Sequence, residues 1–343
     1  MYKKQFQRAA AGLLCMSLVC VGMPSYQAQA RVSSEEAGHE IAVTQLPGTV
    51  VTEKSYDDSF LSVTGYVENG VNDRSAYYEE YVEYNRLLKE KFVADGGKPE
   101  DYVNQNTEDY YVVSNEEEFC EAVASWPKVI ELTTDLNLGY KYMEAQNMKT
   151  YGVVNAISDY NKNNVPISSP DLIRDGVSEI KLKDRDGLTI FSRNGSTIYH
   201  CEIGIVDSND VVIRNIGIQG MNEWDDFEYN SSGTSPGGHK RYDWDNISIY
   251  QCKNIWIDHC SLGIAYDGSV DITDASTATL SWCRIGEPDE RTLQEMQNTM
   301  DYMEELYQQG KGHKFYTALR DGGATKDQIM KFSQLNDKVH AFS

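Results

Sequence analysis

Hydrophobic residues alternate with polar ones in short stretches that recur along the middle of the chain. Between about residues 180 and 286, four such stretches begin at residues 186, 210, 254 and 277, so that their starts are 24, 44 and 23 residues apart. They read DGLTIFSRN, DVVIRNIGI, NIWIDHCSL and TATLSWCRI. A further stretch precedes three of them at a fixed offset: EIGIVDSN, NISIYQCK and SVDITDAS. Apolar residues at every second position predict β-strands with one buried face.

The near-constant spacing predicts how these strands are arranged. A single coil of this length cannot bury its apolar row, whereas stacked coils bury a continuous one, as in solenoids. The step of 44 residues indicates one coil with a polar loop inserted at about residues 220–242. No helical pattern separates the strands, which argues against a doubly wound sheet, and a β-sandwich would not need so constant a register. We therefore predict an all-β fold, a parallel β-helix.

A capping helix is expected before the repeats. Residues 114–117, Ser-Asn-Glu-Glu, form a capping box in which Ser114 and Glu117 satisfy backbone amides reciprocally. A short helix should then cover residues 115–125, and residues 129–138 should form the first strand. The apolar face of this helix consists of Phe119, Cys120 and Val123.

The segments on either side carry helical patterns as well. In the polar, tyrosine-rich region of residues 31–110, Tyr77–Phe92 predicts one amphipathic helix. After Gly286, apolar residues at steps of three and four predict a helical insertion that Gly310 ends. A second short helix is expected at Lys326–Phe332. The residues of the apolar stripe are Leu293, Met296, Met300, Met303 and Tyr307.

The start of the chain has the pattern of a secretory signal peptide. Lys3, Lys4 and Arg8 are followed by an apolar run at 9–23 and a small-x-small cleavage pattern at 27–30. The run is too short to span a bilayer, and no later stretch is long and apolar enough, so we expect a secreted mature chain. The predicted organisation is a signal peptide at 1–30, an N-terminal extension at 31–110, the β-helix domain at 111–286, the helical insertion at 287–332, and the start of a further coil at 333–343, after which the chain ends.

The charge of the chain limits the classes of molecule that it can bind. The chain has 53 Asp and Glu against 31 Lys and Arg, a net charge of −22 at pH 7. This charge argues against nucleic-acid binding, and it would repel an acidic polymer unless cations mediate the contact. We expect a monomer without a nucleic-acid or membrane partner.

Cysteines give no sign of a metal site. The mature part contains no C-x-x-C pair, which argues against zinc. The odd number permits one or two disulfides, although we expect several of these residues to be buried free thiols. They are Cys120, Cys201, Cys252, Cys260 and Cys283.

Four aspartates near the repeats could hold a metal ion. Asp243 and Asp245 open one strand and face the same way, and Asp267 and Asp271 belong to the next coil. Because stacked coils lie about 4.8 Å apart, carboxylates distant in sequence can meet on one face. A calcium ion, with about six to eight oxygen ligands, would offset their repulsion, although the residues by themselves favour the simpler interpretation as solvated strand-end acids. Strict alternation puts the two pairs on opposite phases, so a turn or bulge must re-aim one pair.

At these positions the sequence resembles the pectate lyases of polysaccharide lyase family 1. The resemblance covers roughly residues 110 to 286 and rests on SNDVVIRNIGI (208–218), YDWDNISI (242–249), KNIWIDHCSL (253–262) and DGSVDITDAS (267–276). It implies a right-handed parallel β-helix and a calcium-dependent β-elimination on polygalacturonate, the de-esterified form of pectin. The family's primary calcium site has two acidic residues on the strand before the W-I-D-H block and two on the strand after it. These positions match Asp243 and Asp245, and Asp267 and Asp271.

The resemblance also implies basic residues that this sequence matches less well. In the family, an arginine in an R-x-P-x-x-R pattern removes the C5 proton, and a lysine on the preceding coil holds a substrate carboxylate. That pattern is absent here, and the last arginine is Arg320. The lysine corresponds to Lys338 in LNDKVHAFS or, as second choice, to Lys314 in GHKF. We therefore expect a C-terminally truncated relative without the catalytic arginine, which could be inactive as written.

Two other function classes stay open. One is a non-catalytic β-helix that binds acidic polysaccharide through calcium. The other is a polygalacturonase-like hydrolase, in which Asp243, Asp245 and Asp267 would supply carboxylates about 5 to 9.5 Å apart. Asp258 and His259 look catalytic by residue type, but in a tight turn we expect them to bond to backbone and neighbouring coils.

Overall fold

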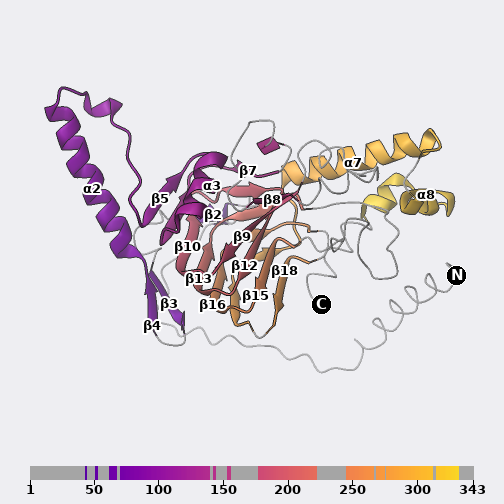
Figure 1. The fold of residues 1–343 in the computed structure, drawn as a ribbon. Helices are drawn as coiled ribbons and strands as arrows, with labels where there is room; N and C mark the ends of the chain where they lie inside the picture. Colours follow the sequence, from indigo (N-terminus) through magenta and orange to yellow (C-terminus); the bar gives the residue numbers. More distant parts are fainter. Residues whose placement is uncertain are drawn as a thin grey trace. The chain divides into compact units, whose positions relative to one another are not determined.

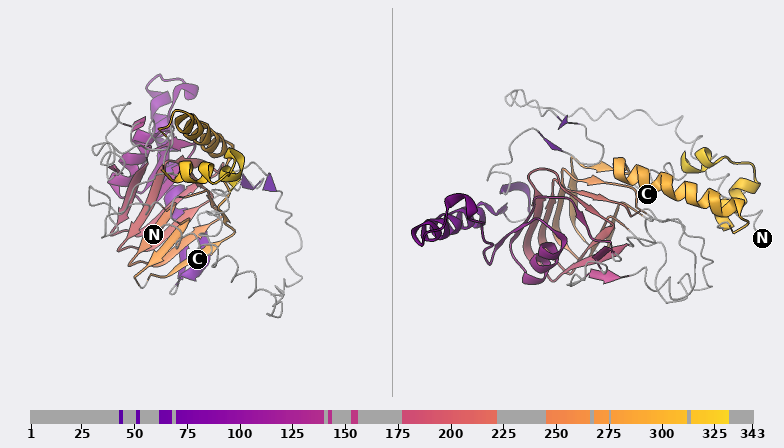
Figure 2. Two further views of the ribbon diagram at one scale, coloured as in Figure 1. Left: turned by 90° about the vertical axis from the view of Figure 1, so that its right-hand side faces the viewer. Right: turned by 90° about the horizontal axis from the view of Figure 1, so that it is seen from above.

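The strands form three parallel sheets stacked around one apolar interior (Figures 1 and 2). The computed structural model describes residues 43–44, 51–52, 62–67, 70–139, 142–143, 153–155, 177–221, 245–265, 268–274, 276–311 and 314–331. One circuit of the chain places one strand in each sheet, which makes each circuit one coil. The predicted parallel β-helix is therefore confirmed. The predicted signal peptide, the inserted loop beyond residue 221 and the segment at 333–343 lie outside the described residues.

The three sheets are named here by their order along a coil that starts at β10. The first sheet contains β5 (Tyr110–Val113), β6 (Val129–Leu132), β10 (Asp186–Ser192), β13 (Asn209–Arg214), β16 (Lys253–Asp258) and β19 (Ala278–Ser281). The second contains β7 (Leu136–Asn137), β11 (Thr197–Tyr199), β14 (Gly217–Gln219), β17 (Ser261–Leu262) and β20 (Arg284–Ile285). The third contains β8 (Val153–Asn155), β9 (Ser178–Lys183), β12 (Cys201–Val206), β15 (Ile247–Tyr250) and β18 (Val270–Thr273), with β8 antiparallel to β9. Two small antiparallel pairs precede them, β1 (Val43–Thr44) with β2 (Val51–Thr52) and β3 (Ser62–Val67) with β4 (Gly70–Asp73).

The register of the first sheet shows how the repeat is built. Val211 pairs with Leu188 on one side and with Ile255 on the other, and Ile255 pairs with Ala278. The steps between coils are therefore 23, 44 and 23 residues, so the predicted first step of 24 was wrong by one residue. Each inward position stacks an apolar side chain on another, which buries a continuous row. One such row consists of Ile130, Ile190, Ile213, Ile257 and Leu280.

Polar residues with left-handed backbone conformations make the corners of the coils. Asp184, Asp207, Gln251 and Asp274 stack at one corner, each with a positive φ near 50°. Asn and Asp tolerate this conformation better than most residues, which explains the polar breaks between strands. A corner also interrupts the single strand predicted at 129–138, which is divided into β6 and β7. The short strands of the second sheet were not predicted; β14, β17 and β20 follow a different corner, formed by Asn215, His259 and Trp282.

Helix α3 (Glu116–Ser125) covers the start of the solenoid, as predicted, but begins differently. Its N-cap is Asn115, whose side chain accepts a hydrogen bond from the Glu118 backbone amide at 3.0 Å. Glu118 in turn accepts from the Ser114 backbone amide at 2.7 Å. The predicted capping box is therefore shifted by one residue: the N-cap is Asn115 instead of Ser114, and the glutamate partner is Glu118 instead of Glu117. The apolar residues Phe119, Cys120 and Val123 are buried, as expected.

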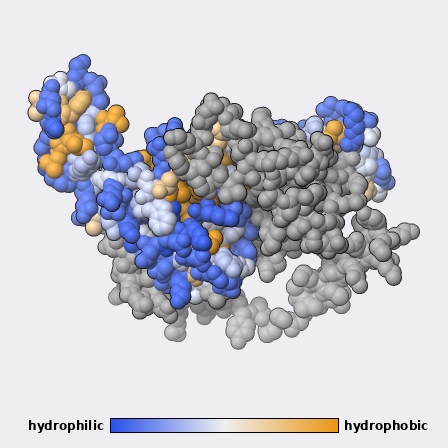
Figure 3. Space-filling model, viewed as in Figure 1, coloured by the Kyte–Doolittle hydropathy of each residue, from blue (hydrophilic) through white to orange (hydrophobic). Residues whose placement is uncertain are grey.

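Helix α2 (Ser75–Ala94) confirms the helix predicted at Tyr77–Phe92. A 3-10 turn, η2 (Pro99–Asp101), follows it. Figure 3 shows hydrophobic residues between hydrophilic ones on the surface of α2, in agreement with the exposed Val82 and Leu87. The start of the helix is bound to the solenoid by an ion pair of 2.7 Å between Arg74 Nη2 and Asp210 Oδ2.

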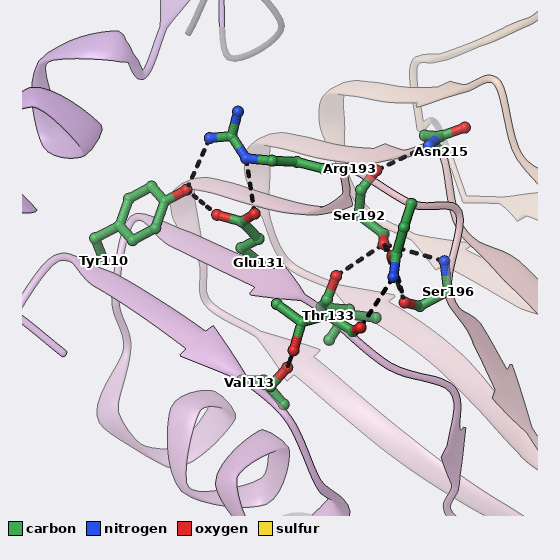
Figure 4. A network of polar contacts seen from close by, with 10 residues as sticks. Tyr110, Val113, Glu131, Thr133, Ser192, Arg193, Ser196 and Asn215 are labelled. Atoms are coloured by element: carbon green, nitrogen blue, oxygen red, sulfur yellow. Dashed lines mark hydrogen bonds and ion pairs between the residues drawn. The ribbon is translucent and has the colours of Figure 1, made fainter. Parts of the chain in front are cut away.

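A partly buried ion pair lies on the first sheet (Figure 4). Arg193 Nε lies 2.7 Å from Glu131 Oε1, and the Tyr110 hydroxyl donates to Glu131 Oε2. Burial and the neighbouring Glu131 charge raise the pKa of Tyr110 far above its ordinary value, so this hydroxyl keeps its proton. The ring of Tyr110 stacks on Tyr81 of α2 at 4.9 Å, and the Arg193 guanidinium lies 4.6 Å from the Tyr78 ring centre. The ion pair and Tyr110 thus hold α2 against the surface of the first sheet.

The insertion after Gly286 contains two helices, α7 (Glu290–Gln308) and α8 (Lys314–Asp321), and residues 326–331 are helical as well. Met296, Met300 and Met303 of the predicted stripe are buried, whereas Leu293 is 37% exposed. Helix α8 was not predicted. No helix within the described ranges is long and apolar enough to cross a membrane.

Helix α7 binds the second sheet through polar side chains. The Tyr199 hydroxyl donates to its N-cap residue, Asp289, at 2.5 Å. His200 is 1% exposed, and its ring nitrogens face Asn137 Oδ1 at 3.2 Å and Glu295 Oε2 at 3.0 Å. These two contacts connect the buried ring to the second sheet and to α7.

We expect the docking of α7 to weaken at acidic pH. Burial alone would raise the pKa of Glu295, but its hydrogen bonds and charge contacts with His200 and Arg291 outweigh burial and lower the pKa from its ordinary value of 4.5. A lowered folded-state pKa stabilises the protein above that ordinary value, and the stabilisation is lost as pH falls through the folded pKa. Hydrogen exchange of the α7 amides, corrected for the intrinsic pH dependence, should therefore accelerate below about pH 4.5. Glu295→Gln should remove this acceleration, and an unchanged profile in that variant would contradict the assignment.

Candidate functional site: an oxygen-lined face on the third sheet

The outward face of the third sheet carries carboxylates on successive coils. Glu179 of β9 pairs in register with Glu202 of β12. The next outward column contains Gly204, Ser248 and Asp271. Sequence reasoning missed Glu179 and Glu202. Their separation of 23 residues, the length of one coil, was the signal that could have identified them.

Asp245 lies two residues before the start of β15 and is only 3% exposed. Its Oδ1 accepts a hydrogen bond of 2.8 Å from the Gly268 backbone amide on the next coil. Its Oδ2 lies 3.3 Å from Ser248 Oγ, on the outward side of the sheet. By strict alternation Asp245 would point inward with Ile247, but the bend at Asn246 turns its side chain outward. A bend thus brings Asp245 to the face that carries Asp271.

Two glycines leave room for these carboxylates. A Cβ atom on Gly268 would lie 2.8 Å from Asp245 Oδ1, and one on Gly204 would lie 2.9 Å from Glu179 Oε1. Any larger residue at position 268 would displace Asp245 from the backbone amide that holds it. The close approach of the two coils therefore depends on the glycine of the DGSVD segment.

The structure describes half of the predicted metal-binding residues. Asp271 is exposed on β18 and in register with Ser248. Asp243, Asp267 and Lys338 lie outside the described residues, although Gly268, the hydrogen-bond partner of Asp245, directly follows Asp267. Lys314 begins α8, but its side chain is not among those described. Among the residues that the structure describes, no three Asp, Glu, His or Cys side chains form a ready metal cluster.

The donor atoms on this face fit a hard cation. Around Asp245 they are carboxylate oxygens and the hydroxyl oxygen of Ser248. Calcium prefers oxygen ligands, whereas zinc prefers nitrogen and sulfur. The described cysteines are free thiols, and Cys120, Cys201, Cys252 and Cys260 are buried. The residues present therefore suit calcium better than zinc.

Asp258 and His259 form a structural network on a different sheet. Asp258 Oδ2 lies 2.8 Å from Arg214 Nε and 2.9 Å from His259 Nδ1, and the Ser281 hydroxyl donates to Oδ1 at 2.6 Å. Burial would raise the pKa of Asp258, but the contacts with His259, Ser281 and Arg214 lower it overall. A carboxylate held in this way is a weak base, and it ties three successive coils together. The predicted bonding of Asp258 to neighbouring coils is present.

Known proteins share both the sequence and the fold of this region. A family model described as pectate lyase matches residues 178–300. Pectate lyase B of Paenibacillus amylolyticus is 34% identical over 180 residues, which make up 52% of this chain and 42% of that protein. The pectate trisaccharide-lyase of Thermotoga maritima is 37% identical over 106 residues, 31% of this chain and 26% of that protein.

One solved structure is similar over a longer part of the chain. A pectate lyase from Paenibacillus sp. 0602 superposes with a TM-score of 0.54 and 28% identity, over 68% of this chain and 50% of that one. This likeness fits the predicted right-handed parallel β-helix. The matched parts amount to half or less of the length of each of these relatives. The matching family model, the shared solenoid and the identity to these relatives together show that the solenoid region of this chain is similar to pectate lyases.

Proposed function

We propose that this chain acts in a secreted, calcium-dependent pectate lyase that cleaves polygalacturonate by β-elimination. The observation that carries the proposal is the buried carboxylate of Asp245, held 2.8 Å from the Gly268 amide on an oxygen-lined face within the family domain. The signal-like segment at 1–30 supports secretion. The proposed calcium ligands are Asp243, Asp245, Asp267 and Asp271.

The residues of this chain have distinct roles in the proposed reaction. A bound calcium ion would neutralise the substrate uronate and acidify its C5–H bond. Asp245, fixed by the Gly268 amide, would be one of the residues that hold the ion. Lys338 is the proposed substrate-binding lysine, with Lys314 as the alternative. A base removes the C5 proton, the electron pair forms the C4=C5 double bond, and the glycosidic oxygen leaves from C4.

The base remains unassigned within this sequence. The family's R-x-P-x-x-R pattern does not occur in it. A second candidate function is the binding of polygalacturonate through calcium without cleavage. Ultraviolet absorbance of unsaturated products distinguishes the two, because only elimination creates the conjugated double bond. Release of reducing ends without this absorbance would instead support a hydrolase.

Asp245→Asn is expected to weaken calcium binding by at least about tenfold, because it removes the charge of a buried ligand without changing its shape. Isothermal titration with calcium measures the affinity, and product absorbance or retention on a polygalacturonate gel, each with and without chelator, measures function. The matched control is Asp327→Asn, since Asp327 is exposed on the helix at 326–331. Equal calcium affinity of Asp245→Asn and the control would contradict the proposed site.

A further inference from the structure

Two cysteines are stacked on adjacent coils inside the solenoid. Ser261 pairs with Arg284 at an offset of 23 residues, and the strand pair on the other side of the corner has the same offset. This register places Cys260 directly opposite Cys283, and the Arg284 amide donates to the Cys260 carbonyl at 2.9 Å. Cys260 belongs to the apolar core, and Cys283 packs against it.

The two side chains have the same orientation, one coil apart. Cys260 Sγ lies 3.5 Å from the Ile213 carbonyl oxygen, and Cys283 Sγ lies 3.5 Å from that of Ile257, in each case on the preceding coil. Each sulfur also lies 3.3 Å from the carbonyl oxygen two residues before it. The two thiol groups therefore form one row, in which they are close enough to share a hydrogen bond.

The spacing of the coils suits a disulfide bond. Neighbouring parallel strands lie about 4.8 Å apart, and the two Cα atoms of a disulfide are about 4.4–6.8 Å apart. Directly opposed cysteines thus meet the backbone requirement without a shift in register. The other described cysteines are placed differently: Cys120 belongs to α3, Cys201 is in register with Ser178, and Cys252 lies beside Ser276.

One member of the pair can react with a molecule from the solvent. Cys260 is fully buried, whereas Cys283 is partly exposed. The hydrogen bond from Cys260 lowers the pKa of the Cys283 thiol below its ordinary value, whereas burial raises the pKa of Cys260. Because the thiolate is the form that attacks a disulfide, Cys283 is the residue that reacts first.

We propose that Cys260 and Cys283 are a redox pair, which a small disulfide compound oxidises to a disulfide bond between two coils. The Cys283 thiolate attacks one sulfur of the compound, whose S–S bond breaks, and the half that leaves takes up a proton. The Cys260 thiol then loses its proton and displaces the second half from Cys283. In total the two protein thiols give up two electrons and two protons, which convert the compound into two thiols.

The bond would join the coil that contains β17 to the coil that contains β20, directly before α7. A link of this kind stabilises a protein mainly because it restricts the unfolded chain. Disulfide bonds persist in oxidising surroundings such as the extracellular space, where the proposed function places the chain. The inference goes beyond that function and does not depend on the proposed calcium site.

The test incubates the reduced, folded full chain with oxidised glutathione and maps its peptides without reduction. Cys260 and Cys283 should appear in one linked pair of peptides, the midpoint of urea unfolding should rise, and a thiol reductant should reverse both changes. Cys260→Ser should stop the reaction at the mixed disulfide, with glutathione bound to Cys283. Cys283→Ser should leave Cys260 as a free thiol, because its remaining cysteine is buried.

Cys252→Ser is the matched control. Cys252 is also fully buried, but it lies at a different corner, beside Ser276. This variant should form the link between Cys260 and Cys283 and gain stability from it as the unaltered protein does. Free thiols at both positions after oxidation of the unaltered protein, or a link from either one to another cysteine, would overturn the inference. Neither result would bear on calcium binding.

Discussion

Replacing Ile213 by alanine should lower the free energy of unfolding by about 2–5 kcal/mol, the cost of a cavity in a packed core. The side chain is fully buried and lies between Ile190 and Ile257 in the inward row of the first sheet. Because each coil contacts only its neighbours, one gap weakens the interfaces on both sides. Urea unfolding followed by circular dichroism measures the change.

Ile272→Ala provides the matched control for this prediction. Ile272 also belongs to an inward row, paired with Ile249, but it lies on the last described coil and is 43% exposed. Truncation there removes less buried surface and creates no closed cavity, so the unfolding midpoint should shift much less. Equal losses in the two variants would show that the stacked rows do not account for the stability of the solenoid.

Glu131→Ala should destabilise the protein by about 3 kcal/mol, because it leaves a partly buried guanidinium without its counter-charge. Glu131 accepts from Arg193 Nε at 2.7 Å and from the Tyr110 hydroxyl, and it is 7% exposed. The loss should also loosen α2, since Tyr110 stacks on Tyr81. Thermal unfolding measures the first effect, and hydrogen exchange of the α2 amides measures the second.

An exposed ion pair on α2 itself supplies the comparison. Glu83 binds Arg86 at 2.7 Å, but both side chains are at least half exposed. Water screens such a pair, so Glu83→Ala should leave the unfolding temperature nearly unchanged. A large loss in that variant, or none in Glu131→Ala, would contradict the assignment of the buried pair as the anchor.

Local patterns in the sequence predicted much of the fold. Alternating stretches at near-constant spacing identified β10, β13, β16 and β19 and the strands before three of them, and the apolar stripe identified α7. The predicted strands and spacings were wrong where a strand is too short to show an alternation of apolar and polar residues. The second sheet uses strands of two or three residues, shorter than any alternation, and the step between β10 and β13 was misjudged by one residue at a polar corner.

The residues of the candidate site could be predicted from the sequence only in part. The W-I-D-H and DGSVD segments identified the aspartates through resemblance to a family, and Asp245 lies on an oxygen-lined face. Ser248 lies in the YDWDNISI segment without having been singled out there, and the only signal for Glu202 was its separation of 23 residues from Glu179. The alternation required a turn or bulge that re-aims one aspartate pair, and only the structure places a bend at Asn246, which turns Asp245 outward.

The sequence by itself determined the repeat, the inward rows and the acidic character of the chain, because these depend on residue type and periodicity along one coil. The tertiary structure decided which polar groups meet across coils: Asp245 with Gly268, Ser248 with Glu202, and His200 with Glu295. Such pairs depend on how one coil is stacked on the next and on where the corners turn the backbone. A shift of one residue in that register would move each of these side chains to the other face of its sheet.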